Sequence, residues 1–283
     1  MKWNDVVSLN EAFVPACDIK AKDSNYWKRF IPHKDFYNLL DKTLDMYKNR
    51  QKAIWLQGTY GSGKTHATMV IKEIFSRDLD EIKDYVEHSI KDPKLKPAIL
   101  NTKKELKTFP VILKGSYHIV DSKTFAFAIQ QEVMEALLQA GIKHSLKTSF
   151  ETVLNNIENH PTFWNDLIKT SELQFEIDSD IEILKNKLKQ YDSHILKLCE
   201  DELRKRDIHI GVKNIVKFLE EASSVVKEYG YSHITLFWDE FTSVLETPNY
   251  NDIFMSLQNI AENIKNGNVF LFIVSTGQLI LIK

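Results

Sequence analysis

Short apolar runs alternate along this chain with longer segments in which apolar residues recur every three or four positions. Four runs have the length and composition of buried strands: Ala53 to Leu56, Phe109 to Gly115, His233 to Glu240, and Val269 to Val274. Continuous apolar strands are typical of parallel sheets whose two faces are both covered by helices. The pattern therefore predicts an α/β fold with three layers and a mainly parallel central sheet.

Amphipathic segments between these strands predict the helices. They run from His33 to Arg50, Lys64 to Phe75, Ser122 to Leu138, Val212 to Tyr229, and Asp252 to Lys265. The last of these places Phe254 on its apolar side. Pro110 indicates that the second strand begins at that residue. Residues 76–106 suggest a charged connection, with helix-like spacing from Leu79 to Val86.

Residues 142–230 are predicted to be helical and are longer than a compact connection requires. Steps of three and four, typical of a coiled-coil seam, separate Ile181, Leu184, Leu188, Tyr191, Ile195 and Leu198. This segment is either a helix pair packed on the core or an inserted arm that docks a partner. The domain prediction is an N-terminal arm at 1–25, a core at 26–141 and 212–283, and a helical insertion at 142–211.

The octapeptide GTYGSGKT lies between the first predicted strand and its helix. Gly58, Gly63, Lys64 and Thr65 match the spacing of a phosphate-binding loop, whose backbone N–H groups and helix dipole surround an anion. Lys64 would reach the β- and γ-phosphates, and the Thr65 hydroxyl would bind Mg²⁺. The residues expected to contact the nucleotide are Gly58, Thr59, Tyr60, Gly61, Ser62, Gly63, Lys64, Thr65 and His66.

Asp239 and Glu240 end the third strand, at the edge where open α/β sheets bind ligands. Asp239 is expected to hold Mg²⁺ through water, and Glu240 to polarise the attacking water. The fourth strand closes on Ser275 and Thr276. Either hydroxyl could sense the γ-phosphate, with Thr276 as the first candidate and Gln278 as a weaker one. A short hydroxyl at this place can instead cap the following helix.

Composition and charge bear on the expected partners and on the cellular compartment. A net charge of −2 gives no overall argument for nucleic acid or membrane. Residues 91–107 carry six lysines against two acids, a run that predicts a solvated face more than a nucleic-acid patch. Cys17 and Cys199 have no metal-ligand spacing, so we expect buried thiols in a reducing compartment. Without a signal peptide or membrane span, the expectation is a soluble, cytoplasmic protein.

With GTYGSGKT, FWDEF and the tip at Ser275 and Thr276, the chain resembles P-loop ATPases of the additional-strand class, most closely AAA+ proteins and the related origin-recognition and signalling ATPases. The stretch from Ile54 to Thr65 also resembles large bacterial ATPases of phage-defence systems. The AAA+ resemblance implies that Ile31, Pro32 and His33 line the adenine; packing at the start of a helix is the equal alternative.

The chain differs from AAA+ proteins after the fourth strand, where those proteins continue with an arginine finger and a helical lid. We expect this chain to be the N-terminal part of a larger ATPase, or to receive finger and lid from elsewhere. Arg204 and Arg206 match no finger motif. A homo-oligomer or larger complex is expected, with a protein partner at the insertion.

The function expected is binding and hydrolysis of Mg-ATP, coupled to remodelling of a protein or DNA partner. A nucleotide-dependent switch with little turnover, in phage defence for example, is the alternative, and a small-molecule kinase is disfavoured by Glu240. The motifs serve ATP or GTP alike, but the chain has no Asn-Lys-x-Asp guanine signature, which favours adenine.

Overall fold

The computed structural model describes residues 25–49, 51–115, 119–208, 214–264 and 268–276. Its centre is a four-stranded sheet in the order β1, β4, β3, β2. The strands are β1 (Ala53–Gly58), β2 (Thr108–Lys114), β3 (His233–Asp239) and β4 (Val269–Thr276). All neighbouring strands in it are parallel, which confirms the predicted α/β class and mainly parallel sheet.

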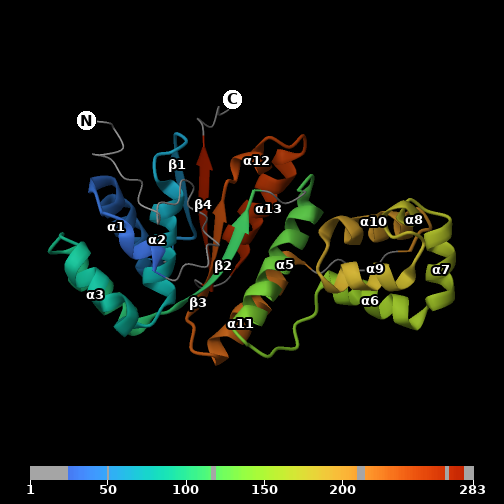
Figure 1. Cartoon of the computed structure of the whole chain (residues 1–283), viewed down its shortest axis with the longest axis horizontal. Helices are drawn as coiled ribbons and strands as arrows, with labels where there is room; N and C mark the ends of the chain where they lie inside the picture. Colours follow the sequence, from blue (N-terminus) through green and yellow to red (C-terminus); the bar gives the residue numbers. More distant parts are fainter. Residues whose placement is uncertain (1–24, 50, 116–118, 209–213, 265–267, 277–283) are drawn as a thin grey trace, which may run out of the picture.

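Helices cover both faces of the sheet (Figure 1). The first face carries η2 (Tyr26–Arg29), α1 (Lys34–Asn49), α2 (Lys64–Ser76), α3 (Leu79–Ser89) and α4 (Leu95–Glu105). The second face carries α5 (Ser122–Gln139), α11 (Ile215–Glu228) and α13 (Tyr250–Asn263). Strand residues alternate between the two apolar layers, as a period of two requires: Phe237 faces the first group of helices, and Leu236 and Trp238 face the second.

Capping side chains fix where helices on both faces begin. Asp78 and Glu81 form a capping box at the start of α3, and Asp121 and Thr124 form one at the start of α5. In each, a side-chain oxygen accepts a backbone N–H that the first turn leaves unpaired, which stabilises a helix by about 1 kcal/mol. The start of α5 is thereby held at a defined residue, Asp121.

Two predictions for the region after α2 are wrong. β2 begins at Thr108, before Pro110. Since β2 is an edge strand of the described sheet, the missing N–H of Pro110 can face away from β3. The supposed charged connection at 76–106 holds two helices, of which α4 was not foreseen. Leu95 and Ile99 of α4 are buried in the first apolar layer.

The lysine-rich run at 91–107 is not simply a solvated face. Lys103 is buried, and its Nζ donates to the carbonyls of Phe75 at 3.0 Å and Arg77 at 2.6 Å, where α2 ends. Burial, helped by the charge of Lys107, lowers the pKa of Lys103 from 10.5 to about 8. Lys96 similarly donates to the carbonyl of Glu87 near the end of α3. Lysine side chains that donate to the last carbonyls of a helix satisfy groups left unpaired there, so these lysines secure helix ends.

A second, helical lobe lies beside the sheet domain (Figure 1). It contains α6 (Ser149–Asn159), α7 (Pro161–Lys169), α8 (Leu173–Glu176), α9 (Ile181–Lys189) and α10 (Ser193–Arg204). These helices share an apolar cluster of their own, to which α5 adds Phe127. The lobe therefore has an independent core that touches the sheet domain through α5.

The predicted coiled-coil seam is divided between two helices, α9 and α10. Tyr191 adopts a left-handed φ of 59°, and the chain turns there. Asp192 then starts α10 by accepting the N–H groups of His194 and Ile195 at 3.0 and 3.1 Å. The apolar residues of the seam do pack on one cluster, but they reach it from α9 and α10.

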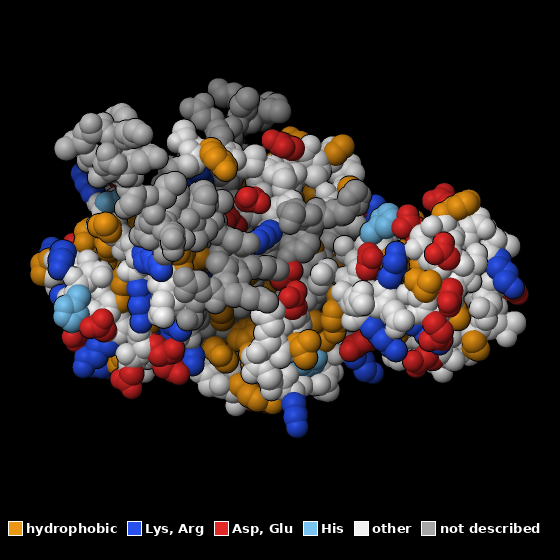
Figure 2. Space-filling model, viewed as in Figure 1, with side chains coloured by type: hydrophobic (Ala, Val, Ile, Leu, Met, Phe, Trp, Pro, Cys, Tyr) orange, Lys and Arg blue, Asp and Glu red, His pale blue; other side chains and the backbone are white. Residues whose placement is uncertain are grey.

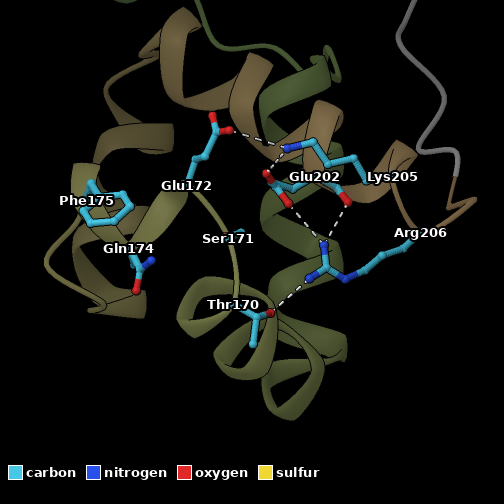
Figure 3. A pocket seen from close by; sticks show the side chains of 8 residues that line it. All are labelled: Thr170, Ser171, Glu172, Gln174, Phe175, Glu202, Lys205 and Arg206. Atoms are coloured by element: carbon cyan, nitrogen blue, oxygen red, sulfur yellow. Dashed lines mark hydrogen bonds and ion pairs between the residues drawn. The ribbon is translucent and has the colours of Figure 1, made fainter.

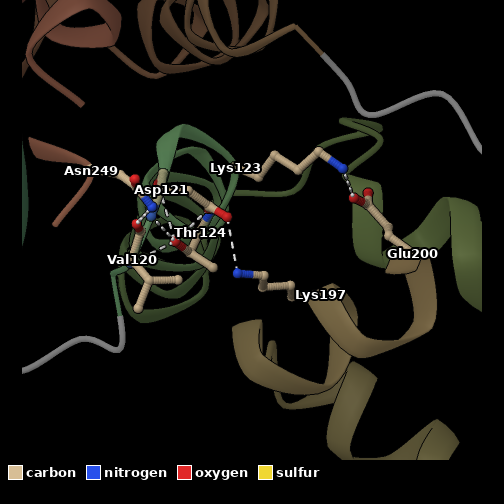
Figure 4. A network of polar contacts seen from close by, with 7 residues as sticks. All are labelled: Val120, Asp121, Lys123, Thr124, Lys197, Glu200 and Asn249. Atoms are coloured by element: carbon tan, nitrogen blue, oxygen red, sulfur yellow. Dashed lines mark hydrogen bonds and ion pairs between the residues drawn. The ribbon is translucent and has the colours of Figure 1, made fainter. Parts of the chain in front are cut away.

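Two ion pairs join the lobe to the start of α5 (Figure 4). Lys197 of α10 binds Asp121 at 2.9 Å, and Lys123 binds Glu200 at 3.1 Å. Burial raises the pKa of Glu200, and Lys123 opposes that rise. On the opposite side, Asn249 donates to the backbone carbonyl preceding Asp121 at 3.0 Å. The start of α5 is thus held by the lobe and by the segment between β3 and α13.

On the face shown in Figure 2, basic and acidic side chains are interspersed over the lobe. Its Cys199 is buried, as predicted, and burial raises the pKa of the thiol. Cys17 and nearly all of the predicted N-terminal arm lie outside the described residues. Within the described residues, no helix has the length and apolarity needed to cross a membrane.

The predicted apolar side of α13 needs one correction. Ile253, Leu257 and Ile260 are buried, but Phe254 is 47% exposed. Phe254 follows Ile253 by one position, about 100° around the helix, so it lies at the margin of the buried stripe. Its ring lies 6.5 Å from that of Trp55, centroid to centroid.

Candidate functional site

The glycine-rich loop joins β1 to α2 in the strand-loop-helix order that the sequence predicts. Gly61 and Gly63 have φ values of 75° and 81°, a left-handed conformation that glycine adopts without steric cost. The carbonyl of Gly63 accepts the N–H of Ala67 at 2.9 Å, so regular helical bonding begins at that glycine. Residues 59–63 are exposed. The loop therefore presents its backbone at the N-terminus of α2, where an anion is favoured.

Lys64 bends back over this loop. Its Nζ donates to the carbonyl oxygens of Gly58 at 2.9 Å and Thr59 at 2.7 Å. Partial burial lowers the pKa of Lys64, and the negative charge of Asp239 opposes that change. The ammonium group thus lies between the loop and the end of β3.

Asp239 is the buried carboxylate of the site, with 5% of its surface exposed. The hydroxyl of Thr65, the second residue of α2, donates to it, and the N–H of Glu240 donates to its Oδ1 at 2.9 Å. Burial raises the pKa of Asp239; these hydrogen bonds, Lys64 and Lys114 oppose the rise without cancelling it. The structure therefore brings together the two predicted magnesium ligands, Thr65 and Asp239.

Glu240 has an exposed side chain on a constrained backbone. Its φ of 57° is left-handed, which is uncommon for a residue with a Cβ and is often found at functional positions. Gly115 explains how this conformation is held: a Cβ at that position would collide with the Glu240 carbonyl and the Ser243 hydroxyl. Ser243 donates to the carbonyl of Gly115 at 2.6 Å. The end of β2 thus supports the turn that carries Glu240.

The tip of β4 separates the two predicted sensor hydroxyls. Ser275 accepts a hydrogen bond from Trp55 Nε1 at 2.8 Å, and Trp55 packs in the second layer, beside Phe241 and Phe254. Thr276 lies on the opposite face, in register with Gly58. Thr242, in the short helix α12 (Thr242–Leu245), contacts Thr276: the hydroxyls are 3.0 Å apart, and Thr276 N–H donates to Thr242 Oγ1 at 2.7 Å. Thr276 alone therefore shares the face of the glycine-rich loop; Gln278 lies outside the described residues.

A pocket of about 320 Å³ opens beside the loop. α1 contributes Asp35, Phe36 and Leu39 to its wall, and the loop and α2 contribute the opposite side. Of the three residues nominated for an adenine, His33 lines this pocket. Ile31 does not line it and is 84% exposed.

Two residues of the predicted nucleotide contact set have side chains engaged or placed elsewhere. The ring of His66 stacks on Tyr26 with centroids 4.8 Å apart, and its edge meets Phe30 at 5.0 Å. Burial lowers the pKa of His66 from its ordinary 6.5. The ring of Tyr60 is 90% exposed. Any contact between His66 and a nucleotide would therefore come from its backbone.

Lys114 is a site residue that the sequence analysis missed. It ends β2 and pairs in register with Asp239 of β3. Its side chain is half-buried, and its charge acts on the Asp239 carboxyl. A single lysine at the end of a strand matches no motif; only the parallel pairing of β2 with β3 reveals its position.

A second pocket, of about 460 Å³, lies on the helical lobe (Figure 3). Arg206 donates to Glu202 at 3.2 Å and to Thr170 at 3.0 Å, and Lys205 binds Glu202 at 2.6 Å. Glu172 adds a second acid to the same wall. The two cations and two acids balance, so this pocket has no charge preference for an anion.

No family model, curated protein or solved structure matches this chain. Among the described residues, no three His, Cys, Asp or Glu side chains gather into a metal cluster. Thr65 and Asp239 would supply two oxygen ligands, which fits Mg²⁺, because that ion keeps several waters and is seldom enclosed by protein.

Proposed function

We propose that this chain binds Mg-ATP and hydrolyses it as a P-loop ATPase of the additional-strand class. The observation that carries the proposal is the interaction of the Thr65 side chain with the buried Asp239 carboxyl, whose pKa it lowers. It joins the start of α2 to the end of β3, although β4 separates β1 from β3 in the sheet. A phosphate-binding loop and an acidic strand end separated by one strand are the arrangement that the additional-strand resemblance implies.

Each residue has a defined role in the proposed reaction. The loop backbone and Lys64 would bind the phosphates, and Thr65 and Asp239 would hold Mg²⁺. Bound Mg²⁺ would neutralise charge on the phosphate oxygens. Glu240 would accept a proton from the water that attacks the terminal phosphorus, releasing ADP and inorganic phosphate. Thr276, on the same face, would orient that water or sense the terminal phosphate.

The helical lobe favours one alternative, a nucleotide-dependent switch. The lobe has its own core, and its ion pairs bind the first turn of α5, close to the end of β2 in the chain. Bound nucleotide could therefore set the position of the lobe with little turnover, and the lobe would contact a protein partner. Hydrolysis and switching use the same residues but differ in what Glu240 does.

The test is steady-state phosphate release from ATP and Mg²⁺, with and without double-stranded DNA, together with equilibrium ATP binding. Lys64→Ala should abolish ATP binding, because it removes the cation over the loop. Glu240→Gln should abolish release and keep binding. Lys169→Met, on the exposed end of α7, is the matched control and should change neither.

Three outcomes distinguish the ATPase from the nucleotide-dependent switch. A wild-type chain that binds no ATP rejects the proposal. Tight binding without release, unchanged by Glu240→Gln, favours the switch. Release that DNA stimulates identifies DNA as the partner.

A further inference from the structure

We propose that Lys114 is a second cation of the nucleotide site, placed by β2 so that its ammonium group contacts the terminal phosphate of ATP. This inference rests on the proposed function of the site. It assigns to the described residues a positive charge that the sequence analysis expected from a longer chain or from elsewhere.

The register of the sheet determines where Lys114 lies. Lys114 and Asp239 are Cα partners across β2 and β3, and the Gly115 N–H donates to the Asp239 carbonyl at 3.0 Å. Paired residues of parallel strands project to the same face. Ile112, two positions earlier, packs in the first apolar layer, on the side of the sheet covered by α2. Lys114 therefore emerges on the face that carries Asp239, Thr65 and the glycine-rich loop.

The backbone at the end of β2 is fixed. Ser243 binds the carbonyl of Gly115, and the Glu240 turn packs against Gly115 where no side chain would fit. Lys114 is half-buried at the end of this strand, and its charge acts on the buried Asp239 carboxyl of the neighbouring strand. The position of the charge is thus set by the same turn that carries Glu240.

The charges around the site are otherwise unbalanced. Asp239 and Glu240 bring two negative charges to the strand ends, and Lys64 brings one positive charge. Arg204 and Arg206 belong to the separate lobe, where Arg206 is bound to Glu202 (Figure 3). Of the described cations, Lys64 and Lys114 are the two whose charges act on Asp239. Lys114 would therefore complete the charge that a transferring phosphoryl group requires.

This position predicts a specific effect on nucleotide preference. Lys64 is placed over the loop, where it reaches the β- and γ-phosphates, so both ATP and ADP would contact it. Lys114 comes from the far side of Asp239 and would contact only the γ-phosphate. Its removal should weaken ATP binding more than ADP binding and should also slow hydrolysis.

The experiment compares Lys114→Met, Lys114→Arg, Lys64→Ala and Lys169→Met in the full chain. Equilibrium dissociation constants for ATP and ADP with Mg²⁺, phosphate release and thermal melting are measured for each. Lys114→Met should lose the preference for ATP over ADP, and its kcat should fall by about a hundredfold, the usual cost of removing one transition-state charge donor. Lys114→Arg should restore part of the preference for ATP and part of kcat. Lys169→Met should match wild type in both measurements.

The outcomes separate this inference from the proposed function. If wild type binds ATP and Lys64→Ala does not, but Lys114→Met keeps the wild-type ratio of ATP to ADP affinity, the Lys114 inference is overturned and the proposed function stands. If wild type binds neither nucleotide, both are overturned. Equal weakening of ATP and ADP with a lowered melting temperature would assign Lys114 a structural role and also reject the inference.

Discussion

Asp239 of the sheet domain and Glu202 of the helical lobe are both buried acids, and their pKa values shift in opposite directions. In the lobe, burial acts against the charge of Glu202, but hydrogen bonds and ion pairs with Lys205 and Arg206 outweigh it and lower its pKa. At the sheet edge, burial raises the pKa of Asp239, and the opposing hydrogen bonds and lysines do not restore it. Neighbouring side chains therefore offset the cost of burying the charge of Glu202, but they do not fully offset that cost for Asp239.

This difference distinguishes the candidate site from the lobe. Burial alone marks neither acid, because both are nearly inaccessible. Asp239 of the sheet edge and Glu200 of the lobe both keep a raised pKa, but Asp239 lies beside the left-handed Glu240 and the exposed glycine-rich loop. Perturbed groups of this kind gather at functional sites, and a bound cation would supply the charge that Asp239 lacks. In the lobe, by contrast, Lys205 and Arg206 outweigh the effect of burial on Glu202.

The largest expected effect tests whether the two regions are energetically separate. Leu188 is fully buried in the lobe cluster, so Leu188→Ala should cost about 3 kcal/mol of unfolding free energy there. The ATP dissociation constant should stay within about twofold of wild type, since loss of lobe packing leaves the loop intact. Denaturant unfolding and equilibrium binding measure both. Leu138→Ala, at an exposed position of α5, is the control; lost ATP binding would contradict the separation.

Gly115→Ala should impair the candidate site directly, unlike the substitution in the lobe. The added Cβ would collide with the Glu240 carbonyl, costing about 2 kcal/mol and displacing the turn that carries Glu240. Phosphate release should fall much further than ATP affinity. Gly230→Ala controls for glycine replacement, because its φ of 86° strains the backbone away from the site. Normal release by Gly115→Ala would show that the position of Glu240 is not limiting.

A matched pair of substitutions compares the two acids directly. Asp239→Asn removes an undercompensated charge and should raise the stability of the metal-free protein by about 1 kcal/mol while abolishing dependence on Mg²⁺. Glu202→Gln should lower stability by a similar amount, because it leaves Lys205 and Arg206 without their shared partner. Thermal melting with and without Mg²⁺ measures the direction of the stability change for each substitution. Destabilisation in both cases would remove the distinction between the two acids.

The smallest effect concerns pH. The pKa of Lys103 is about 8 in the folded chain against 10.5 unfolded, so the unfolded chain binds more protons between these values. Stability contributed by Lys103 therefore rises as pH increases from about 8 to 10.5. Neutral Lys103 keeps two N–H donors for the carbonyls that it caps. Unfolding free energies of wild type and Lys103→Met should show this rise in their difference; a difference independent of pH would place Lys103 in solvent.

Local signals in the sequence were enough for much of this architecture. The apolar runs give all four described strands, and the spacing from Gly58 to Thr65 and the acids at Asp239 and Glu240 give the candidate site. Each signal is complete within a few neighbouring residues. The contact between Thr65 and Asp239 follows from two such local signals and the parallel sheet.

What escaped prediction depends on distant partners. α4 was missed because its lysines obscure the apolar period, and Lys103 is buried only because α2 ends beside it. The break at Tyr191 has no signature, since a tyrosine rarely adopts a left-handed φ. Lys114 becomes a site residue only through its pairing with β3, and Ser275 differs from Thr276 only through the alternation of β4 faces.

The strand order also sets the timing of folding during synthesis. In the described sheet, β1 pairs only with β4, and the hydrogen-bonded residues Trp55 and Ser275 of these strands are 220 positions apart. A ribosome would thus expose the glycine-rich loop long before β4 emerges, while the helical lobe, built from local contacts, could already fold. The nascent chain would hold an unanchored β1 until its last described strand arrives, so nucleotide binding would mark completed translation of this region.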